Sequence, residues 1–286
     1  DNVRLAIDVD LQNYIAEMLV DSLPNPVTMN QKNATQAAAV VMSAKTGEVL
    51  ALVSVPTYDN NIFAQVAQRG AEYEELATNN ATRPLTNKAL SQALPGSTYK
   101  LITAAAALQE GNITPSTSRD IPSRILEIKG ENGVIYPLVD WRAHGSGIDL
   151  TQAIAWSSNI YMFMAVCGIP NGSLQPHKAI GKDVDSSASI FAYYQRAFGM
   201  GQPTGIDIPG EDIGRVPDPA WKARNYAGPE YTDNDRDWFY ADTCFTAIGQ
   251  QDVLATPLQI ARMTAAIATG KLFTPHVAKD ILDADG

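Results

Sequence analysis

The sequence predicts an α/β fold in which an antiparallel sheet lies between helices and joins a mostly helical part. Two short apolar runs rich in β-branched residues flank a turn-forming tetrapeptide, which indicates a β-hairpin over about residues 37–55. Helical spacing of apolar residues appears before this hairpin and again after it. Most of the expected helices fall within about residues 97–200, so this stretch is predicted to be the helical part.

The first expected helix covers residues 11–23, where six apolar side chains share one face: Leu11, Tyr14, Ile15, Met18, Leu19 and Leu23. The runs "AAAVVMS" and "EVLALVS" then form the hairpin around the turn Ala44-Lys45-Thr46-Gly47. Pro56 ends its second strand, because proline cannot donate a ladder hydrogen bond.

The later helices have local start and stop signals. Ser97 is expected to open one helix and Gly111 to close it, and another starts near Asp149. The runs "IYMFMAVCG" and "SIFAYYQRAFG" predict two more helices, and "RILEIK" predicts a short strand. A last helix begins at Thr256-Pro257, a cap followed by proline, and stops at Gly270.

Composition excludes several classes of function. With 45% apolar and 18% charged residues, the 286-residue chain is an ordinary globular sequence. A net charge of −10 argues against a nucleic-acid partner, because such proteins present basic faces to phosphates. No apolar run approaches the roughly 20 residues of a membrane span.

The cysteines and histidines indicate no metal site. Cys167 lies in an apolar run and is predicted to be a small core residue. Together with Cys244 it does not define a disulfide framework, so the compartment stays open. The histidines at 144, 177 and 276 show no metal-ligand spacing, and we predict neither a metal nor an organic cofactor.

The stretch "LPGSTYKLITAAAAL" places Ser97 three residues before Lys100. One interpretation is a helix cap followed by a solvated lysine. The other is chemical, because side chains three apart on a helix share a face and a lysine with a lowered pKa can take the proton of a serine hydroxyl. The positive end of the helix dipole also lowers the pKa of a first-turn lysine.

A second polar group occurs in "AIAWSSNIYMF", between two apolar helical stretches. It is either a polar interhelical turn or a functional corner. In the second case Ser157 offers a hydroxyl that relays a proton, and Asn159 offers an amide that holds a substrate carbonyl. Ser158, between them, is given no chemical role.

Taken together, six stretches in order resemble the transpeptidase domain of class B penicillin-binding proteins of the elongation type. They are "LAIDVDLQNYIAEML", "AAAVVMSAKTGEVLALVSVPTYDNN", "RPLTNKALSQALPGSTYKLITAAAAL", "HGSGIDLTQAIAWSSNIYMF", "FGMGQPTGIDIPGEDIGRVPDPAW" and "TAIGQQDVLATPLQIARMTAAIATG". Each short motif is weak by itself, but their order along nearly the whole chain is specific. The resemblance implies the transpeptidase fold that serine β-lactamases share.

The resemblance also implies roles for individual residues. Ser97 would be the nucleophile that attacks the bond between the two D-alanines of a peptidoglycan stem peptide, and Lys100 would be its general base. Ser157 would pass a proton to the leaving amine, and Asn159 would hold the substrate amide. β-Lactams would acylate Ser97 as substrate mimics.

By the same resemblance, the protein would work on the outer face of the bacterial cytoplasmic membrane, anchored by a segment upstream of Asp1. Expected partners are stem peptides ending in D-Ala-D-Ala, β-lactam antibiotics, a glycan-polymerising membrane protein and other elongation factors.

Three departures from the family pattern stand out. The family's Lys-Thr/Ser-Gly motif, expected after the last helix, is absent, so we expect this chain to be incomplete and inactive by itself. Lys45-Thr46-Gly47 spells that motif but falls in the expected hairpin turn, and we assign it no catalytic role. Gln251 stands where the family has glycine, which leaves a positive φ at this position in question.

The acidic stretch at 226–243 is predicted to be a solvated loop rather than a rim of the site.

Two other functions remain. A serine β-lactamase or β-lactam sensor shares the Ser-x-x-Lys spacing, but "TGIDIPGE" and "TPLQ" disfavour it. A non-catalytic scaffold of the cell-wall synthesis complex is supported only by the absent third motif.

Overall fold

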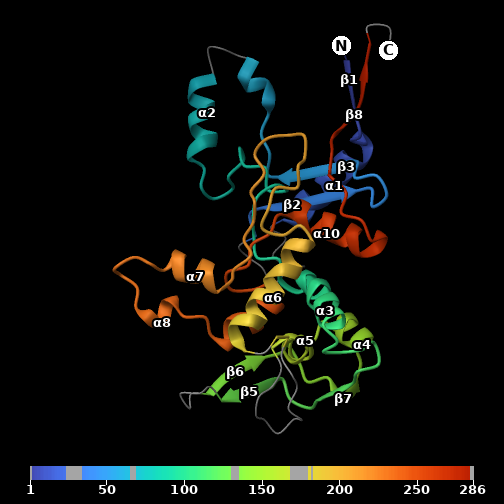
Figure 1. The fold of residues 1–286 in the computed structure, drawn as a ribbon. Helices are drawn as coiled ribbons and strands as arrows, with labels where there is room; N and C mark the ends of the chain where they lie inside the picture. Colours follow the sequence, from blue (N-terminus) through green and yellow to red (C-terminus); the bar gives the residue numbers. More distant parts are fainter. Residues whose placement is uncertain are drawn as a thin grey trace. The chain divides into compact units, whose positions relative to one another are not determined.

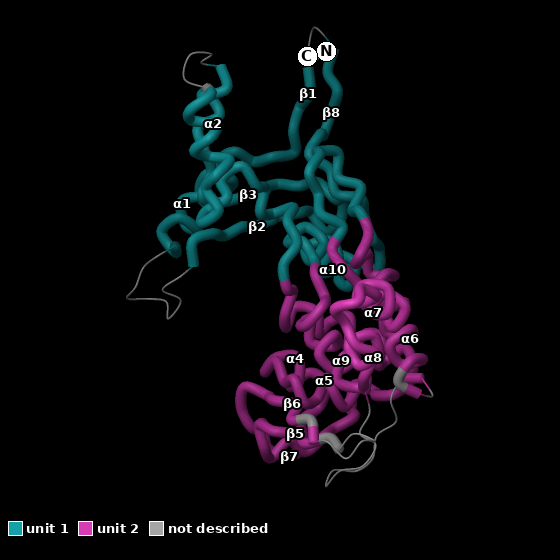
Figure 2. The backbone as a smooth tube through the Cα atoms, turned by 90° about the vertical axis from the view of Figure 1, so that its left-hand side faces the viewer, with its two compact units in different colours: residues 1–93, 203–213, 255–286 teal, residues 94–202, 214–254 magenta. Residues whose placement is uncertain are grey.

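The computed structural model describes residues 2–23, 34–64, 69–129, 135–167, 180–181 and 183–283. The chain forms two compact units, coloured separately in Figure 2. Unit 1 comprises Asp1–Ala93, Pro203–Ile213 and Ala255–Gly286, and unit 2 comprises Leu94–Gln202 and Gly214–Leu254. Because both units are built from separate segments of the chain, no single linker in the sequence marks a boundary between them.

Unit 1 combines two two-stranded ribbons with helices (Figure 1). Its elements are β1 (Asn2–Leu5), α1 (Val9–Ser22), β2 (Ala37–Met42), β3 (Val49–Val55), the 3₁₀ helix η1 (Asn60–Ala64), α2 (Arg69–Thr78), α10 (Pro257–Thr269) and β8 (Ala278–Leu282). The sequence gives no clear signal for α2, which lies in a mixed polar stretch.

The expected hairpin is formed by β2 and β3, which pair antiparallel with Ala38 opposite Ser54. Its turn includes Gly47, which has a φ of +86°. A Cβ atom at this glycine would lie 2.5 Å from the backbone oxygen of Thr274, so a side chain has no room. Lys45-Thr46-Gly47 is therefore a hairpin turn, as predicted.

Helices α1 and α10 cover opposite faces of the hairpin. Ala51, Val53 and Val55 pack against α1, whereas Leu52 packs in a cluster with Leu258 of α10. Side chains alternate between the two faces along a strand, so the odd positions from Ala51 to Val55 face α1 and Leu52 faces α10. Val49, the first residue of β3, is the exception and packs in the cluster with Leu258.

The predicted apolar face of α1 is wrong at one edge. Leu11, Ile15 and Leu19 pack against the hairpin. Tyr14 and Met18 are 61% and 51% exposed. The face of α1 that packs against the hairpin is centred near Ile15 and Leu19. Tyr14 and Met18 therefore lie beyond the strip that a two-stranded ribbon covers.

The second ribbon of unit 1 pairs β1 with β8, and Asn2 lies opposite Leu282. Backbone hydrogen bonds connect the segment directly before β8 both to the chain after β1 and to the hairpin. The N–H of Ala6 donates to Val277 over 2.8 Å, and the N–H of Val49 donates to His276 over 2.9 Å. The hairpin is therefore not an isolated pair of strands, which would be marginally stable.

Helix α10 follows its predicted boundaries. Thr256 caps it by accepting from the N–H of Gln259 over 3.0 Å, and the Gln259 side chain accepts in return from the N–H of Thr256. Gly270 ends the helix in the left-handed conformation, with a φ of +72°. Both ends are set by local residues, a side-chain cap at the start and a glycine at the end, so the sequence was enough to predict them.

Unit 2 is mostly helical. It contains the 3₁₀ helix η2 (Gly96–Tyr99), α3 (Lys100–Gln109), β4 (Arg119–Ile121), β5 (Ile125–Lys129), β6 (Ile135–Val139), β7 (Gly145–Ile148), α4 (Leu150–Ala155), α5 (Asn159–Val166), α6 (Val184–Ala197), α7 (Pro219–Asn225), α8 (Asp233–Arg236) and α9 (Tyr240–Ala247). Helix α5 is its core, because every residue from Ile160 to Val166 is buried. Helices α3 and α9 pack against α5.

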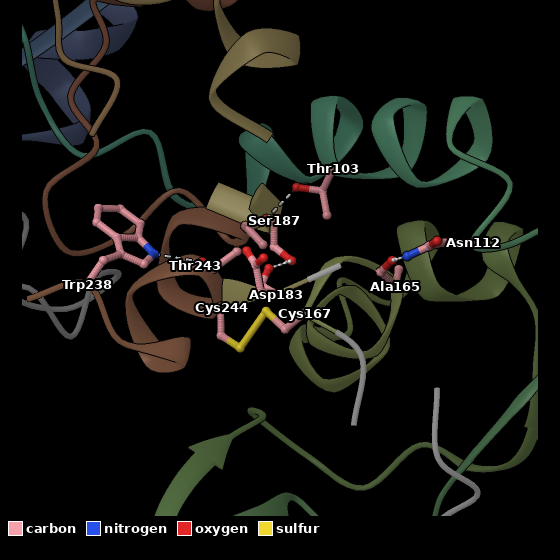
Figure 3. The surroundings of a disulfide bond; sticks show 10 residues. Thr103, Asn112, Ala165, Cys167, Asp183, Ser187, Trp238, Thr243 and Cys244 are labelled. Atoms are coloured by element: carbon pink, nitrogen blue, oxygen red, sulfur yellow. Dashed lines mark hydrogen bonds between the residues drawn. A yellow bond between two sulfur atoms is a disulfide. The ribbon is translucent and has the colours of Figure 1, made fainter. Parts of the chain in front are cut away.

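A disulfide joins Cys167, the C-cap of α5, to Cys244 of α9 (Figure 3). Cys167 is buried, as predicted, at 2% exposure. The interpretation that the two cysteines form no disulfide framework is wrong in this respect. They lie 77 residues apart in the sequence, and only the packing of α5 against α9 brings their Cα atoms to 5.8 Å.

Replacing both Cys167 and Cys244 with alanine is expected to lower the free energy of unfolding by about 2–5 kcal/mol, because the cross-link closes a long loop in the unfolded chain. Urea unfolding with and without a reducing agent measures this change. The reductant should destabilise the parent protein and leave the double variant unaffected. Equal sensitivity of both would show that the bond contributes nothing to stability.

The acidic stretch at 226–243 is more ordered than the predicted solvated loop. It contains α8 and the start of α9. The Arg236 guanidinium donates to the backbone oxygens of Tyr226, Gly228 and Tyr231 over 2.9, 3.3 and 3.2 Å. The carboxylates of Asp233 and Asp235 nevertheless face solvent, which agrees with the solvated character.

Within the described parts of the chain, no helix has the length and apolar character needed to cross a membrane. Over the same residues, no group of three His, Cys, Asp or Glu side chains lies close enough to hold a metal ion. His177, one of the three histidines considered above, falls outside these parts.

Candidate active site

Ser97 lies in the 3₁₀ turn η2, directly before α3, and it is exposed. The prediction that it caps the helix is wrong. Tyr99 occupies the N-cap position of α3, and neither η2 nor α3 has a side-chain cap hydrogen bond. Within the described residues the Ser97 hydroxyl has no hydrogen-bond partner, so it is free to face a ligand.

Gly96 determines the geometry of this turn. Its φ is +56°, a conformation that glycine adopts without strain. Its N–H donates to the carbonyl of Gly249 over 2.9 Å. The turn that presents Ser97 is thus held by a distant segment of the chain rather than by a local cap.

Lys100 is buried, with 2% of its surface exposed. Its ammonium donates three hydrogen bonds: to the Ser157 carbonyl at 2.7 Å, to Ser157 Oγ at 3.0 Å and to Asn159 Oδ1 at 2.6 Å. These bonds use all three protons of the ammonium group. The structure therefore brings together Lys100, Ser157 and Asn159, and Ser97 precedes this lysine by one turn.

Burial lowers the pKa of Lys100 from its usual value to about 8, because desolvation disfavours the charged form. The Asp140 carboxylate acts in the opposite direction and raises the pKa of this lysine. Near neutral pH an appreciable fraction of Lys100 is then uncharged. A lysine at the start of the helix is thus placed where being charged is unfavourable, as the sequence predicted.

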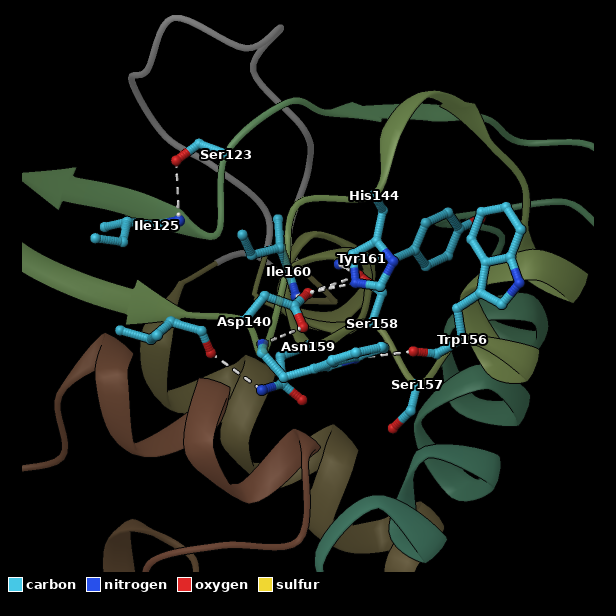
Figure 4. A network of polar contacts seen from close by, with 12 residues as sticks. Ser123, Ile125, Asp140, His144, Trp156, Ser157, Ser158, Asn159, Ile160 and Tyr161 are labelled. Atoms are coloured by element: carbon cyan, nitrogen blue, oxygen red, sulfur yellow. Dashed lines mark hydrogen bonds and ion pairs between the residues drawn. The ribbon is translucent and has the colours of Figure 1, made fainter.

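The corner between α4 and α5 carries Ser157 and Asn159 (Figure 4). Ser157 has a φ of +54°, which is uncommon for a residue with a Cβ atom. Asn159 is the first residue of α5, and its Nδ2 donates to the Val139 carbonyl over 3.0 Å. That contact orients the amide so that Oδ1 faces Lys100.

Ser158, given no chemical role from the sequence, is a structural residue. It is fully buried and is the N-cap of α5, accepting from the N–H of Tyr161 over 3.3 Å. Its hydroxyl donates to Asp140 Oδ2 over 2.8 Å. A serine directly before an apolar helical run is a recognisable cap signal, and it could have been identified from the sequence.

Asp140 is a buried residue of the site that the sequence did not reveal (Figure 4). One of its oxygens accepts from the Ser158 hydroxyl and from the N–H of Ile160 at 3.0 Å. His144 Nε2 lies 3.3 Å from the same oxygen, and the His144 ring stacks on Trp156 with 7° between the ring planes. Asp140 thus fixes both the start of α5 and the corner before it.

Two exposed tryptophans flank this corner. Trp141 Nε1 donates to the Trp156 carbonyl over 2.9 Å, which ties the residue before Ser157 to the chain after β6. The Arg142 guanidinium lies 4.6 and 5.4 Å from the centres of the two indole rings. These contacts restrain the backbone at Trp156, the residue before Ser157 with its positive φ.

Gln251 answers the question raised by its replacement of glycine. Its φ is +62°, so the turn keeps the left-handed conformation although it has a side chain. The Gln251 amide donates to Asp242 Oδ1 over 2.5 Å. The side chain therefore makes a specific contact at a backbone position that ordinarily favours glycine.

The group can perform base chemistry on a hydroxyl. The Ser157 carbonyl and Asn159 Oδ1 can only accept hydrogen bonds, so they hold two protons of a neutral Lys100 amine. The lone pair of that amine is then available to a hydroxyl that can donate. Such an amine is a suitable general base for a serine nucleophile.

Comparisons with known proteins identify the family and the fold of the chain. Residues 37–285 match the family described as "Penicillin binding protein transpeptidase domain". The chain is 32% identical over 283 residues to the peptidoglycan D,D-transpeptidase MrdA of Haemophilus influenzae. That alignment covers 98% of this chain but only 37% of the relative, so the chain spans little more than a third of that protein's length.

Solved structures give the same result for the fold. The complex between penicillin-binding protein PBP2 and MreC from Helicobacter pylori matches with a TM-score of 0.74 and 28% identity, covering 99% of this chain and 46% of that one. A structure of a peptidoglycan synthase complex matches with a TM-score of 0.75 and 31% identity, over 97% of this chain and 44% of that one.

These matches confirm the predicted fold, with its antiparallel strands, flanking helices and mostly helical part. The match to the family extends over most of the chain and includes both the turn with Ser97 and the corner with Asn159. The chain belongs to the family of penicillin-binding protein transpeptidase domains.

Proposed function

We propose that the protein is a peptidoglycan D,D-transpeptidase that acts through an acyl-enzyme on Ser97. The observation that carries this proposal is Lys100, a buried amine with a lowered pKa that is bound to Ser157 and Asn159 and lies one turn after an exposed serine. A solvated lysine would have no such contacts. The curated relative named a D,D-transpeptidase supports the same reaction.

In the proposed acylation, neutral Lys100 takes the proton of the Ser97 hydroxyl, and Ser97 Oγ attacks the carbonyl of the penultimate D-alanine. The Ser97 backbone N–H helps to stabilise the oxyanion. When the peptide bond breaks, the Ser157 hydroxyl passes a proton to the leaving amine of the terminal D-alanine, and Lys100 replenishes it. Asn159 holds the amide of the substrate.

In the second half-reaction, an amine of a neighbouring stem peptide attacks the acyl-enzyme. The amine loses a proton to Lys100 and forms the cross-linking amide, and Lys100 returns the proton to Ser97 Oγ as the ester bond breaks. β-Lactams enter the first half-reaction as substrate mimics, and their opened ring stays attached to Ser97 Oγ.

We further propose that the domain works outside the cytoplasmic membrane, within a membrane-anchored protein. The buried disulfide between Cys167 and Cys244 supports an oxidising compartment. The proposed partners are a glycan-polymerising membrane protein and elongation factors. The related PBP2 structure in complex with MreC and the related peptidoglycan synthase complex support such partners.

The proposal predicts that benzylpenicillin acylates the full-length protein once, and that the Ser97→Ala variant forms no adduct. Intact-protein mass spectrometry before and after treatment measures both masses, and thermal unfolding verifies that the variant is folded. An adduct on Ser97→Ala would place the nucleophile elsewhere. A folded parent protein without any adduct would favour a non-catalytic scaffold.

The lifetime of the adduct separates the remaining alternative. A transpeptidase should keep the penicilloyl group for many minutes, because its site does not activate water efficiently. Rapid recovery of the unmodified mass with release of hydrolysed penicillin would indicate a β-lactamase instead.

A further inference from the structure

The turn that presents Ser97 is held in place from outside the helix that follows it. The segment after α9 runs beside this turn and contacts it at Gly249. The carbonyl of Gly249 accepts from the N–H of Gly96 over 2.9 Å. A Cβ atom at Gly249 would lie 2.4 Å from the Gly96 oxygen and 2.7 Å from Tyr99 Cβ, so the two backbones are in close contact.

A second contact joins the same segment to α3. The hydroxyl of Thr103, which is fully buried, donates to the Ala247 carbonyl over 2.5 Å. The segment 247–249 therefore touches the nucleophile turn and the helix after it. A displacement of this segment would move Ser97 relative to Lys100, since Gly96 precedes the serine directly.

Two residues after Gly249, the side chain of Gln251 binds a buried carboxylate. Gln251 Nε2 donates to Asp242 Oδ1 over 2.5 Å, and Asp242 is 6% exposed. The other oxygen of Asp242 accepts from Lys222 Nζ of α7 and from the N–H of Phe239, each over 2.7 Å. Asp242 is thus fixed by two elements and provides a firm anchor for the Gln251 side chain.

The backbone conformation of residues 249–251 carries a conformational cost. Gly249 and Gln251 both have positive φ values, +67° and +62°, on either side of Gln250. A residue with a Cβ atom keeps such a conformation only when its surroundings hold it there. At Gln251 the contact that does so is the hydrogen bond to Asp242.

We propose that Gln251 is a positioning residue for acylation. Through its bond to Asp242, it holds Gly249 against Gly96 and so sets the place of the Ser97 hydroxyl. This inference rests on the proposed function, because it concerns the rate at which Ser97 is acylated. It assigns a role to the side chain that replaces glycine in this chain.

The test uses reversed hydrogen-bond polarity in the full-length protein. Gln251→Glu places a carboxylate against Asp242 and breaks the contact. In the double variant Gln251→Glu/Asp242→Asn the new amide donates to the new carboxylate, and the net charge of the pair is unchanged. The single variant should acylate about 10- to 100-fold more slowly with fluorescent penicillin, and the double variant should recover most of that loss.

Gln250→Glu is the matched control. It makes the same change of charge at the adjacent exposed residue, and its acylation rate should stay within about twofold of the parent, since Debye screening weakens an exposed charge. Labelling of every variant should still reach one penicillin per folded protein. The loss in Gln251→Glu should appear in the acylation step and not in the affinity for the drug.

Three outcomes would overturn the inference. They are an unchanged rate in Gln251→Glu, an equal loss in Gln250→Glu, and a lower stoichiometry with an unchanged rate for the labelled fraction, which would indicate unfolding. If the parent protein itself is not labelled, the proposed function fails. If the parent is labelled and Gln251→Glu is unaffected, only the inference fails.

Discussion

Replacing Lys100 with methionine is expected to lower the rate of acylation by penicillin about 10²- to 10⁴-fold, because a positioned general base contributes about that much to such a step. Methionine fills a similar volume and removes the amine that is hydrogen-bonded to Ser157 and Asn159. Stopped-flow fluorescence with a labelled penicillin measures the rate. Thermal unfolding should show a folded variant, since a buried charge that needs three partners has been removed.

The assignment of Lys100 as the general base also predicts the direction in which the acylation rate changes with pH. The pKa of Lys100 is lowered to about 8, so its neutral, basic form increases as the pH rises. The acylation rate should therefore increase up to about pH 8 and level off above it. Lys100→Met should have a low rate without this rise. A parent rate that decreases between pH 6 and 9 would contradict the assignment of Lys100 as the base.

Replacing Asp140 with alanine is expected to cost about 2–4 kcal/mol of stability, because it leaves the Ser158 hydroxyl and the Ile160 N–H buried without their acceptor. The corner should then shift, and acylation should fall by more than about 10-fold, since misplaced catalytic groups lose effective molarity. Urea unfolding and penicillin labelling measure the two effects.

Asp140→Asn is the matched control for that prediction. Its oxygen can still accept, so most of the stability should remain, but the charge that raises the pKa of Lys100 is lost. The pH at which acylation levels off should therefore move below that of the parent. Asp140→Ala with parental stability and rate would show that the carboxylate does not hold the corner.

The sequence was sufficient where short-range signals determine the structure. Thr256 and Gly270 bound α10, and Asp149 caps α4 with a capping box to Gln152, because the partners of each cap lie within one helical turn. The resemblance to the family predicted a shared site for Lys100 and Asn159, and the structure places Lys100 Nζ 2.6 Å from Asn159 Oδ1, while their catalytic roles stay a prediction.

Where the partners lie far apart in the chain, the sequence failed. Ser97 looks like a helix cap in the sequence. The turn that contains it is instead held by the hydrogen bond between Gly96 and Gly249, two residues that no local sequence pattern connects. Asp140 gives no signal, because its role depends on the hydroxyl of Ser158, 18 residues later. Tertiary packing determines these positions, and it overrides local preference.

The division of unit 1 into three stretches has a consequence for the order in which the protein folds during synthesis. Strand β1 pairs with β8, so residue 2 waits for residue 282 to emerge from the ribosome. Unit 2 closes earlier, at Leu254. The helical half with the nucleophile should therefore be able to assemble while β1 and the hairpin still lack α10 and β8. During that interval α1 can already cover one face of the hairpin, but the face that packs against Leu258 of α10 is exposed to other chains, which makes this stage the one most open to aggregation.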